Sequence, residues 1–344
     1  MDKPTPQNRS YLSISVALLA VGALTFLLFR NSEKWLRAIL IYLSQAGWAR
    51  TSVSNWGVSW RVASRFVSGT DREAAIATTR ALNDKGLLVT LDYLGESCTN
   101  AGEAQQAQAE ILRLLDDIEK HKLRANVSLK PTQLGLKLDP QLAYENIRVV
   151  VQKAKSVGNF IRIDMEDHPT TDATLNTYRQ LRYTDKLDNV GVVIQSYLYR
   201  SEGDIEQLIE DGARIRLCKG AYAEPPEVAY PQKADVDANY LNLSRMLLSD
   251  KARSNGVYPA FATHDPAMID DVKLYVRANN IPLDSFEFQM LFGIRRDLQV
   301  ALVEEGYRVR VYVPYGTAWY PYFVRRLAER PANIWFFISN FVKA

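Results

Sequence analysis

Four side chains near the end of the chain have the types and the spacing to bind a small acid. On a helix, residues three and four apart are neighbours, so Tyr322 faces Arg325 and Arg326, and Glu329 completes the same face. Each guanidinium offers a planar fork of donors, so two of them can hold one carboxylate from both sides. A solvated face of Arg–Glu pairs would show the same pattern, but the rest of the chain favours a binding site.

This face directly follows a predicted strand. Residues 308–313 alternate a charged or aromatic residue with valine, which predicts a strand that ends at Pro314 and Gly316. Residues 319–330 predict a helix that stops at Pro331. The two arginines therefore lie on a helix just beyond the carboxyl end of a strand.

The composition is that of a folded globular protein. The 344 residues carry a net charge of only +3, and the basic residues are scattered among acidic ones. This balance argues against nucleic acid as a partner. The two cysteines, Cys98 and Cys218, form no CxxC motif and suit a reducing compartment.

Residues 1–34 form an N-terminal tail that contains a candidate transmembrane helix at 11–29. These 19 residues carry no charge. As a helix they would span about 28 Å, close to the roughly 30 Å of a bilayer's hydrocarbon core. An unusual export signal and a buried amphipathic helix are the alternatives. We expect association with the inner (cytoplasmic) membrane, with the catalytic domain on the cytoplasmic side.

A helical arm is predicted over residues 35–84, with a helix start at 70–73. From 85 to 344, short apolar strands alternate with amphipathic helices such as 103–121 and 141–156. The eight predicted strands are 87–93, 125–130, 160–165, 190–197, 214–218, 260–264, 286–290 and 308–313.

The crossover helices fix the class of fold. Strands separated by helices run parallel, because each helix returns the chain to the same end of the sheet. Eight such units predict an α/β fold, a closed (βα)8 TIM-like barrel. A doubly wound open sheet is the weaker alternative, because no GxGxxG follows the first strand.

Seven of the eight predicted strands end in polar residues, at the edge where barrels place their chemistry. Alternation along a strand puts Asp164 on one face with Glu166, and Glu287 with Gln289. A single charged residue at a strand end can be explained by an ion pair with a neighbouring residue. Seven together point to a site, because burying charge without use is costly.

Two chemistries fit these strand ends poorly. A metal site would use Asp164, Glu166 and His168, but barrels usually draw metal ligands from several strands, so no metal is expected. A Schiff base at Lys130 or Lys219 needs a desolvated lysine, whereas Asp, Glu and Gln residues surround both. Many hydrogen-bonding groups and paired cations without an evident nucleophile are typical of a site in which a cofactor does the chemistry.

Four segments, 216–222, 261–264, 286–289 and 312–331, resemble the proline dehydrogenase family, the flavin-dependent enzymes of proline catabolism. The resemblance covers residues 87–331. The length of the chain is similar to that of the short monofunctional bacterial members. Membership implies a distorted (βα)8 barrel that binds FAD.

The resemblance implies roles for the residues that match the family's motifs. The catalytic residues would be Arg216, Lys130, Asp164 and Tyr312. The substrate would contact Lys130, Leu291, Tyr222, Tyr312, Tyr322, Arg325, Arg326 and Glu329. FAD would contact Asp164, Gln195, Arg216, Lys219, Gly220, Thr263, His264 and Gln289.

The implied reaction is oxidation of L-proline to Δ1-pyrroline-5-carboxylate, the first step of proline degradation to glutamate. Hydride would pass from proline C5 to FAD N5, and a membrane quinone is the expected final acceptor. A Schiff-base or metal-dependent barrel lyase acting on a small carboxylate is the alternative enzyme. The non-enzyme alternative is a membrane-anchored barrel that binds a small acid without turnover.

Overall fold

A computed structural model of the chain describes residues 60, 61, 63–95 and 97–329, with the side chains of 327–329 excepted. It contains two compact units, one of residues 64–319 and one formed by residues 1–63 with 320–344. The predicted anchor at 11–29 and most of the predicted helical arm lie outside the described residues. Within the described part, no helix is both long and apolar enough to cross a membrane.

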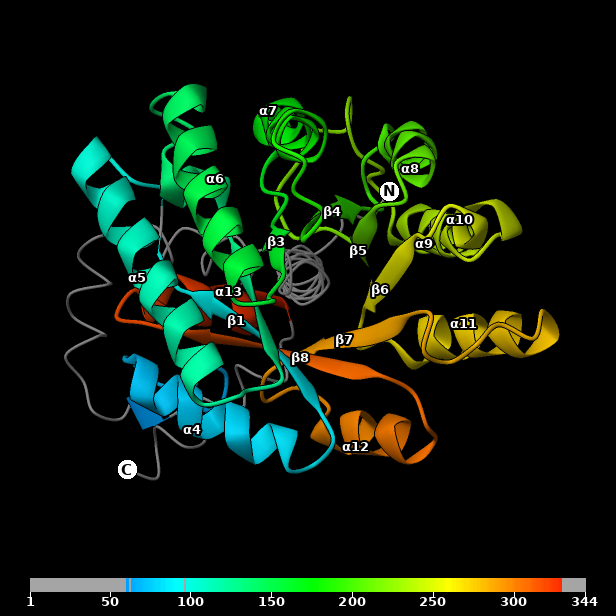
Figure 1. Ribbon diagram of the computed structural model, residues 1–344. Helices are drawn as coiled ribbons and strands as arrows, with labels where there is room; N and C mark the ends of the chain where they lie inside the picture. The colour runs from blue at the N-terminus through cyan, green and yellow to red at the C-terminus, as the bar shows by residue number, and fades with distance from the viewer. Residues whose placement is uncertain (1–59, 62, 96, 330–344) are drawn as a thin grey trace, which may run out of the picture. The chain divides into compact units, whose positions relative to one another are not determined.

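Eight parallel strands close into a barrel in the order of the sequence, and β1 pairs with β8 (Figure 1). This closure confirms the predicted barrel and excludes the open sheet. The strands are β1 (Leu88–Tyr93), β2 (Ala125–Leu129), β3 (Ile161–Ile163), β4 (Val190–Gln195), β5 (Arg214–Cys218), β6 (Tyr258–Ala262), β7 (Glu287–Leu291) and β8 (Val309–Tyr315).

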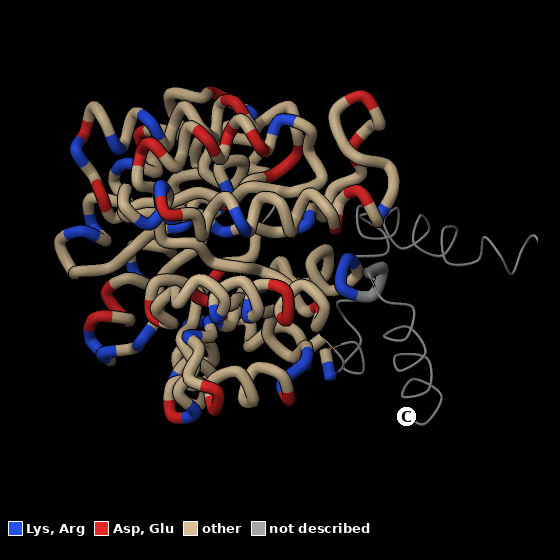
Figure 2. Tube along the Cα trace, turned by 90° about the vertical axis from the view of Figure 1, so that its right-hand side faces the viewer, with Lys and Arg blue, Asp and Glu red and all other residues tan. Residues whose placement is uncertain are grey.

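Helices surround this barrel on its outside (Figure 1). They are α4 (Arg72–Asn83), α5 (Ala101–Lys120), α6 (Pro140–Ser156), α7 (His168–Arg179), α8 (Ser201–Glu210), α9 (Lys233–Leu247), α10 (Asp250–Ser254), α11 (Pro266–Ala278) and α12 (Arg296–Glu304). A 3-10 turn (Pro131–Leu134) follows β2, and a π-helical turn (Gln180–Thr184) follows α7. Basic and acidic residues are interspersed over these helices (Figure 2).

Local sequence explains where the helices begin and which face they bury. The Asn100 side chain accepts a hydrogen bond from the Glu103 amide at 3.0 Å, which satisfies one of the free donors at the start of α5. The predicted apolar stripe of α5 is fully buried, and it consists of Ile111, Leu114, Leu115 and Ile118. Burial of each such side chain contributes roughly 1.5–3 kcal/mol, which holds α5 against the sheet.

The last strand is longer than predicted. Pro314 was expected to end it, but β8 continues through Pro314 to Tyr315. Proline lacks only an N–H, and near a strand end this removes one bond of the ladder. The Pro314 carbonyl still accepts the Ser68 amide at 3.0 Å, and the Tyr315 carbonyl accepts the Leu94 amide at 2.7 Å.

The barrel has an apolar outer face and a polar interior. Val89 and Leu91 of β1 point outward into the core that the surrounding helices share. The alternate residues Thr90 and Asp92 are equally buried but face the interior, where Thr90 donates to Asn126 at 2.5 Å. The hydrophobic core therefore lies between sheet and helices, and the interior is left for polar groups.

Candidate active site

Lys130 is the centre of a group of buried and partly buried polar side chains inside the barrel. Its ammonium lies just beyond β2 and donates to Asp92 Oδ2 at 2.7 Å and to the Tyr312 hydroxyl at 3.3 Å. The Tyr312 hydroxyl donates to Asp164 Oδ2 at 3.0 Å. The ends of β1, β2, β3 and β8 thus bring four charged or phenolic groups together.

Asp164 links this group to Arg216 on β5. Arg216 Nη1 donates to Asp164 Oδ1 at 2.7 Å, and the Ser128 hydroxyl donates to the same oxygen at 2.6 Å. The guanidinium also stacks on the Tyr312 ring, 5.2 Å from its centroid. All four residues predicted to be catalytic, Lys130, Asp164, Arg216 and Tyr312, therefore lie in one network, and their catalytic roles stay a prediction.

Asp92 is the member of this network that sequence reasoning missed. It is fully buried, and its Oδ1 has no hydrogen-bond partner among the described residues. A signal was present, because Asp92 is the one charged residue of the first predicted strand, next to its end. Its partnership with Lys130 depends on the β1–β2 register, which pairs Asp92 with Ser128 and which the sequence does not display.

Charge and burial together set the protonation of this network. Burial lowers the pKa of Lys130, but the charges of Asp92 and Asp164 outweigh it and raise the pKa above its usual value. Burial and the same two carboxylates raise the pKa of the Tyr312 phenol well above its usual range. At neutral pH the site therefore contains an ammonium, a guanidinium and a neutral phenol.

Gln289 joins the network from β7. Its Oε1 accepts a hydrogen bond from Arg216 Nε at 2.6 Å, and its Nε2 donates to Glu287 Oε1 at 2.5 Å. Gln195, the other glutamine predicted to hold FAD, instead donates to the Glu166 carbonyl at 2.9 Å. Both amides are buried, and they brace different parts of the barrel mouth.

Lys219 and Thr263, just after β5 and β6, both contact Asp265. The Lys219 ammonium lies 2.6 Å from Asp237 Oδ1 and 2.9 Å from Asp265 Oδ2. The Thr263 hydroxyl accepts the Asp265 amide at 3.1 Å. Two carboxylates already neutralise Lys219, so an anionic part of a cofactor would have to share its ammonium with them.

His264 and Leu291 are in direct contact. The Leu291 amide donates to His264 Nε2 at 2.8 Å, so this nitrogen carries no proton. Tyr222, predicted to border the substrate, is 40% exposed on the loop after β5. Gly220, the second residue of that loop, has a φ of 110°, which favours glycine.

The residues weighed for a metal site point to different partners. Asp164 binds Arg216, whereas the Glu166 carboxylate accepts the amide and hydroxyl of Thr132 at 2.9 and 2.7 Å. His168 pairs with Glu224. β3 ends at Ile163, before both Asp164 and Glu166, so the strand alternation that predicted a shared face does not apply to them. In the described part of the chain, no three His, Cys, Asp or Glu side chains are arranged to hold a metal.

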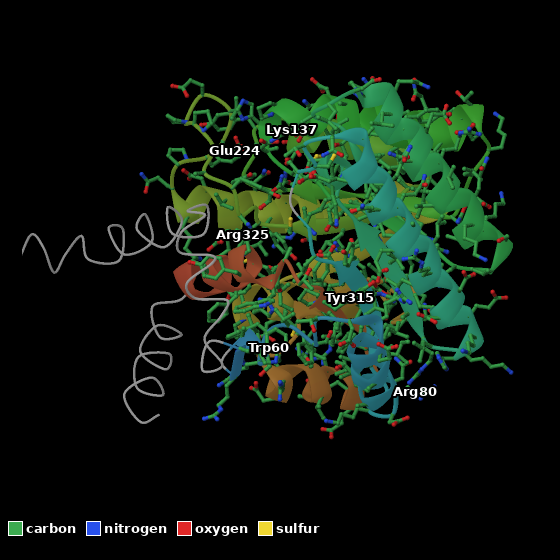
Figure 3. All side chains as sticks on the ribbon, turned by 90° about the vertical axis from the view of Figure 1, so that its left-hand side faces the viewer. Trp60, Arg80, Lys137, Glu224, Tyr315 and Arg325 are labelled. Atoms are coloured by element: carbon green, nitrogen blue, oxygen red, sulfur yellow. The ribbon has the colours of Figure 1, made fainter. Side chains whose placement is uncertain are left out.

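Two loops of the barrel mouth are tied to the start of α7. Lys137, on the segment after β2, donates to Asp167 at 3.0 Å. Glu224, on the loop after β5, accepts the His168 amide at 2.9 Å and contacts its imidazole. Figure 3 shows Lys137 and Glu224 toward the same end of the barrel. These ties hold the loop that carries Tyr222.

The remaining predicted substrate residues lie on α13 (Trp319–Glu329), in the other unit from Tyr320 onward. The predicted helical spacing brings Tyr322 and Arg326 together on α13, where the Arg326 guanidinium stacks on the Tyr322 ring, 5.1 Å from its centroid. That Tyr322, Arg325, Arg326 and Glu329 contact the same substrate as Lys130 stays a prediction.

Comparison with known proteins identifies the family. Residues 75–338 match the proline dehydrogenase family. Proline dehydrogenase 2 of Bacillus subtilis is 43% identical over 307 residues, which cover 89% of this chain and 99% of that protein. Proline dehydrogenase of Deinococcus radiodurans is 45% identical over 287 residues, 83% of this chain and 91% of that protein.

A solved structure shows the same fold within a longer protein. Proline utilization A from Bdellovibrio bacteriovorus, inactivated by N-propargylglycine, superposes with a TM-score of 0.75 at 25% identity. The match covers 87% of this chain but only 37% of that one. The resemblance seen in the sequence motifs is therefore confirmed, the alternative barrel lyase is rejected, and the chain belongs to the proline dehydrogenase family of oxidoreductases.

Proposed function

We propose that this protein oxidises L-proline to Δ1-pyrroline-5-carboxylate with bound FAD. The observation that carries the proposal is the partly buried network of Lys130, Asp164, Arg216 and Tyr312 at the barrel mouth, in a chain of the proline dehydrogenase family. FAD, when bound, accepts the two electrons and the hydrogen that leave C5 of the proline ring.

The barrel residues fit such a cofactor. Arg216 Nη2 is buried and has no hydrogen-bond partner among the described residues, so it is available to an acceptor on a ligand. A Cβ at Gly220 would lie 2.5 Å from the Tyr197 ring, so only glycine lets the loop turn this closely above β5. A positive charge beside the electron-accepting ring of a flavin stabilises the negative charge that reduction creates.

Lys130 is placed to bind the substrate carboxylate. Its raised pKa keeps the ammonium charged, and two acids lie near it, Asp92 on β1 and Asp164 just after β3. The family's arginine pair corresponds to Arg325 and Arg326, which would add two planar forks to the same carboxylate. Fixing the carboxylate holds the small ring in one orientation, which turns a loose encounter into a productive geometry.

The ring nitrogen of proline must lose its proton before oxidation, so that its lone pair can assist the departure of hydrogen from C5. Neither Lys130 nor Tyr312 titrates near neutral pH, because the pKa of each is raised. The substrate's own ammonium therefore controls the pH dependence that we propose, with a rate that rises above neutral pH.

The electrons are proposed to pass to a membrane quinone. The uncharged stretch 11–29 would hold the catalytic domain at the cytoplasmic face of the inner membrane, close to the quinone pool. A quinone analogue should then sustain proline oxidation in isolated membranes. Failure to do so would reject the quinone while leaving the oxidation itself intact.

A visible absorption spectrum of the purified protein, repeated without oxygen after addition of L-proline, tests the central proposal. A flavin spectrum that bleaches with L-proline supports it. Pyrrolidine, which has the same ring without the carboxylate, serves as the matched control and should bleach the flavin far more slowly. A colourless protein that binds no added FAD, or a flavin that L-proline leaves oxidised, contradicts the proposal.

A further inference from the structure

The Gln289 side-chain amide lies between a hydrogen-bond donor, Arg216, and a hydrogen-bond acceptor, Glu287. Its Oε1 accepts from Arg216 Nε at 2.6 Å, and its Nε2 donates to Glu287 Oε1 at 2.5 Å. All three side chains are buried, with exposures of 4% for Gln289, 6% for Arg216 and 2% for Glu287. No water-filled surface is available to replace either bond.

The partners leave this amide only one orientation. A guanidinium has donors alone, and an ionised carboxylate has acceptors alone. The amide oxygen must therefore face Arg216 and the amide NH2 must face Glu287. If Glu287 were replaced by a group that both donates and accepts, the amide could turn over and present NH2 to a donor.

Arg310 keeps Glu287 in its charged form. Its Nε lies 2.7 Å from Glu287 Oε1 and its Nη2 lies 3.0 Å from Oε2, a two-pronged pair inside the barrel. Burial raises the pKa of Glu287, but the charge of Arg310 and the hydrogen bonds from Arg310 and Gln289 lower it further, to below its ordinary value. Glu287 is therefore an acceptor at every pH near neutral.

Strand β6, which lies between Arg216 and Gln289, leaves room for the hydrogen bond between their side chains. Arg216 lies on β5 and Gln289 on β7, and β6 separates them. The β6 residue in register with Arg216 and with Glu287 is Ala260, and Ala262 is in register with Gln289. Two alanines on the intervening strand let the longer side chains meet across it.

Two hydrogen bonds, one at Nε and one at Nη1, fix the orientation of the Arg216 guanidinium. Arg216 Nε is held by Gln289 and Nη1 by Asp164, and the group is planar. The place of Nη2, the nitrogen without a partner among the described residues, is then also determined. If the Gln289 bond is lost, the remaining hydrogen bonds to described residues, with Asp164 and Ser128, both hold Nη1, so the guanidinium can pivot about that nitrogen.

We propose that Glu287 is a positioning residue that acts through the Gln289 amide to aim Arg216 at the bound flavin. This inference rests on the proposed function, because it needs a flavin beside Arg216. Glu287 lies two residues before Gln289 on β7, farther from the carboxyl end of the strand, and its carboxylate contacts Gln289 and Arg310, so its effect on the flavin would pass through Gln289.

The midpoint potential of the bound flavin separates this role from a simple charge effect. Removing a negative charge through Glu287→Gln would by itself make the flavin easier to reduce and raise the potential. Loss of Arg216 alignment has the opposite effect, because a misplaced cation no longer stabilises the reduced ring. We expect the potential to fall, and proline-dependent flavin reduction to slow about tenfold, the usual effect of losing one hydrogen bond to a charged group.

Two further variants complete the test. Glu166→Gln neutralises another buried carboxylate that contacts neither Gln289 nor Arg216, so its potential should not fall. Gln289→Leu keeps the Glu287–Arg310 pair but removes the amide that links Glu287 to Arg216. It should lower the potential as Glu287→Gln does, and adding Glu287→Gln to it should cause no further fall.

The outcomes also separate this inference from the proposed function. A wild-type protein without flavin, or with flavin that L-proline does not reduce, contradicts the function. A functional wild type whose potential is unchanged or raised in Glu287→Gln contradicts the positioning role alone. If Glu287→Gln does not fold, Gln289→Leu decides, because an unchanged potential there equally overturns the role.

Discussion

Lys130 and Asp92 form an ion pair inside the barrel, with 2.7 Å between Nζ and Oδ2 and side-chain exposures of 16% and 1%. The pair joins β1 to the residue that follows β2, at the point where the substrate carboxylate is proposed to bind. Asp164 Oδ2, 3.9 Å away, is the second acid near the same ammonium. Asp92 thus keeps Lys130 charged and fixes where its ammonium lies.

Removing Asp92 should be costly for the fold. Asp92→Ala leaves the Lys130 charge buried with one distant acid, and breaking a buried pair from one side costs about 3–5 kcal/mol. Asp92→Asn should cost less, because the amide oxygen still accepts the bond. Urea unfolding at neutral pH measures both. Lys137→Gln, which breaks the exposed pair with Asp167, is the control and should cost less than about 1 kcal/mol. An Asp92→Ala protein as stable as that control would contradict this account.

Arg326→Lys tests the proposed carboxylate clamp on α13. Lysine keeps the charge but loses the planar fork and the stacking on Tyr322. Loss of a hydrogen bond to a charged group costs about 1.5–3 kcal/mol, so KM for L-proline should rise about tenfold or more, with a smaller change in kcat. Arg308→Lys, at a half-exposed arginine near Asp284, is the matched control. Steady-state kinetics showing the same KM for both variants would remove Arg326 from the substrate site.

The rate should rise with pH above neutral because of the substrate. The pKa of Lys130 and of Tyr312 are both raised, so these groups stay protonated while the proline ammonium loses its proton. Measuring kcat/KM from mildly acidic to alkaline pH should show an ascending limb that Tyr312→Phe lowers in height without displacing along the pH axis. A limb displaced by Tyr312→Phe would instead assign the titration to the protein.

Acid should destabilise the wild type through Glu287. Its pKa is lowered below the ordinary value of 4.5, so the ionised form favours the folded state. That stability is fully present above the ordinary pKa and is lost as the pH falls through the lowered one. Urea unfolding between about pH 5 and pH 3 should therefore show a steeper decline for the wild type than for Glu287→Gln. Equal slopes would mean that Glu287 keeps an ordinary pKa in the fold.

The sequence predicted the barrel because its periodicity is local. The apolar stripe of α5 and the short strands between helices can be recognised from neighbouring residues, and the strand-end rule then placed Lys130, Asp164, Arg216 and Tyr312 together. Asp92 was missed because its role in the site comes from its ion pair with Lys130, which follows the neighbouring strand β2.

The features that the sequence did not predict correctly, or did not predict at all, are likewise determined by tertiary contacts. Pro314 normally ends a strand, but pairing with β1 carries β8 past it. Alternation does not apply to Asp164 and Glu166, because β3 stops at Ile163, and Glu166 contacts Thr132 whereas Asp164 contacts Arg216. Alternation placed Glu287 on one face with Gln289, but the orientation of the Gln289 amide also requires Arg216 from β5, a contact that no sequence pattern displays.

The stretch 11–29 leads to the last prediction. If it anchors the protein, the full chain should sediment with membranes, and a variant without residues 1–34 should remain in the soluble fraction. The truncated protein should reduce an artificial dye with L-proline as fast as the full chain, because the barrel network from Asp92 to Tyr312 is unchanged. Its reduction of membrane quinone should fall, because the flavin is no longer held at the bilayer.

A double substitution separates anchoring from a contribution of the segment to the fold. Leu18→Arg with Leu19→Arg keeps the chain length but places two charges in the middle of the stretch, where each costs about 2.5–3.5 kcal/mol in a bilayer. We expect this variant to behave like the truncated one, with dye reduction intact and quinone reduction weakened. A double variant that stays in the membrane fraction would show that the stretch is not what attaches the protein. Loss of dye reduction in both variants would instead show that the segment supports the catalytic fold.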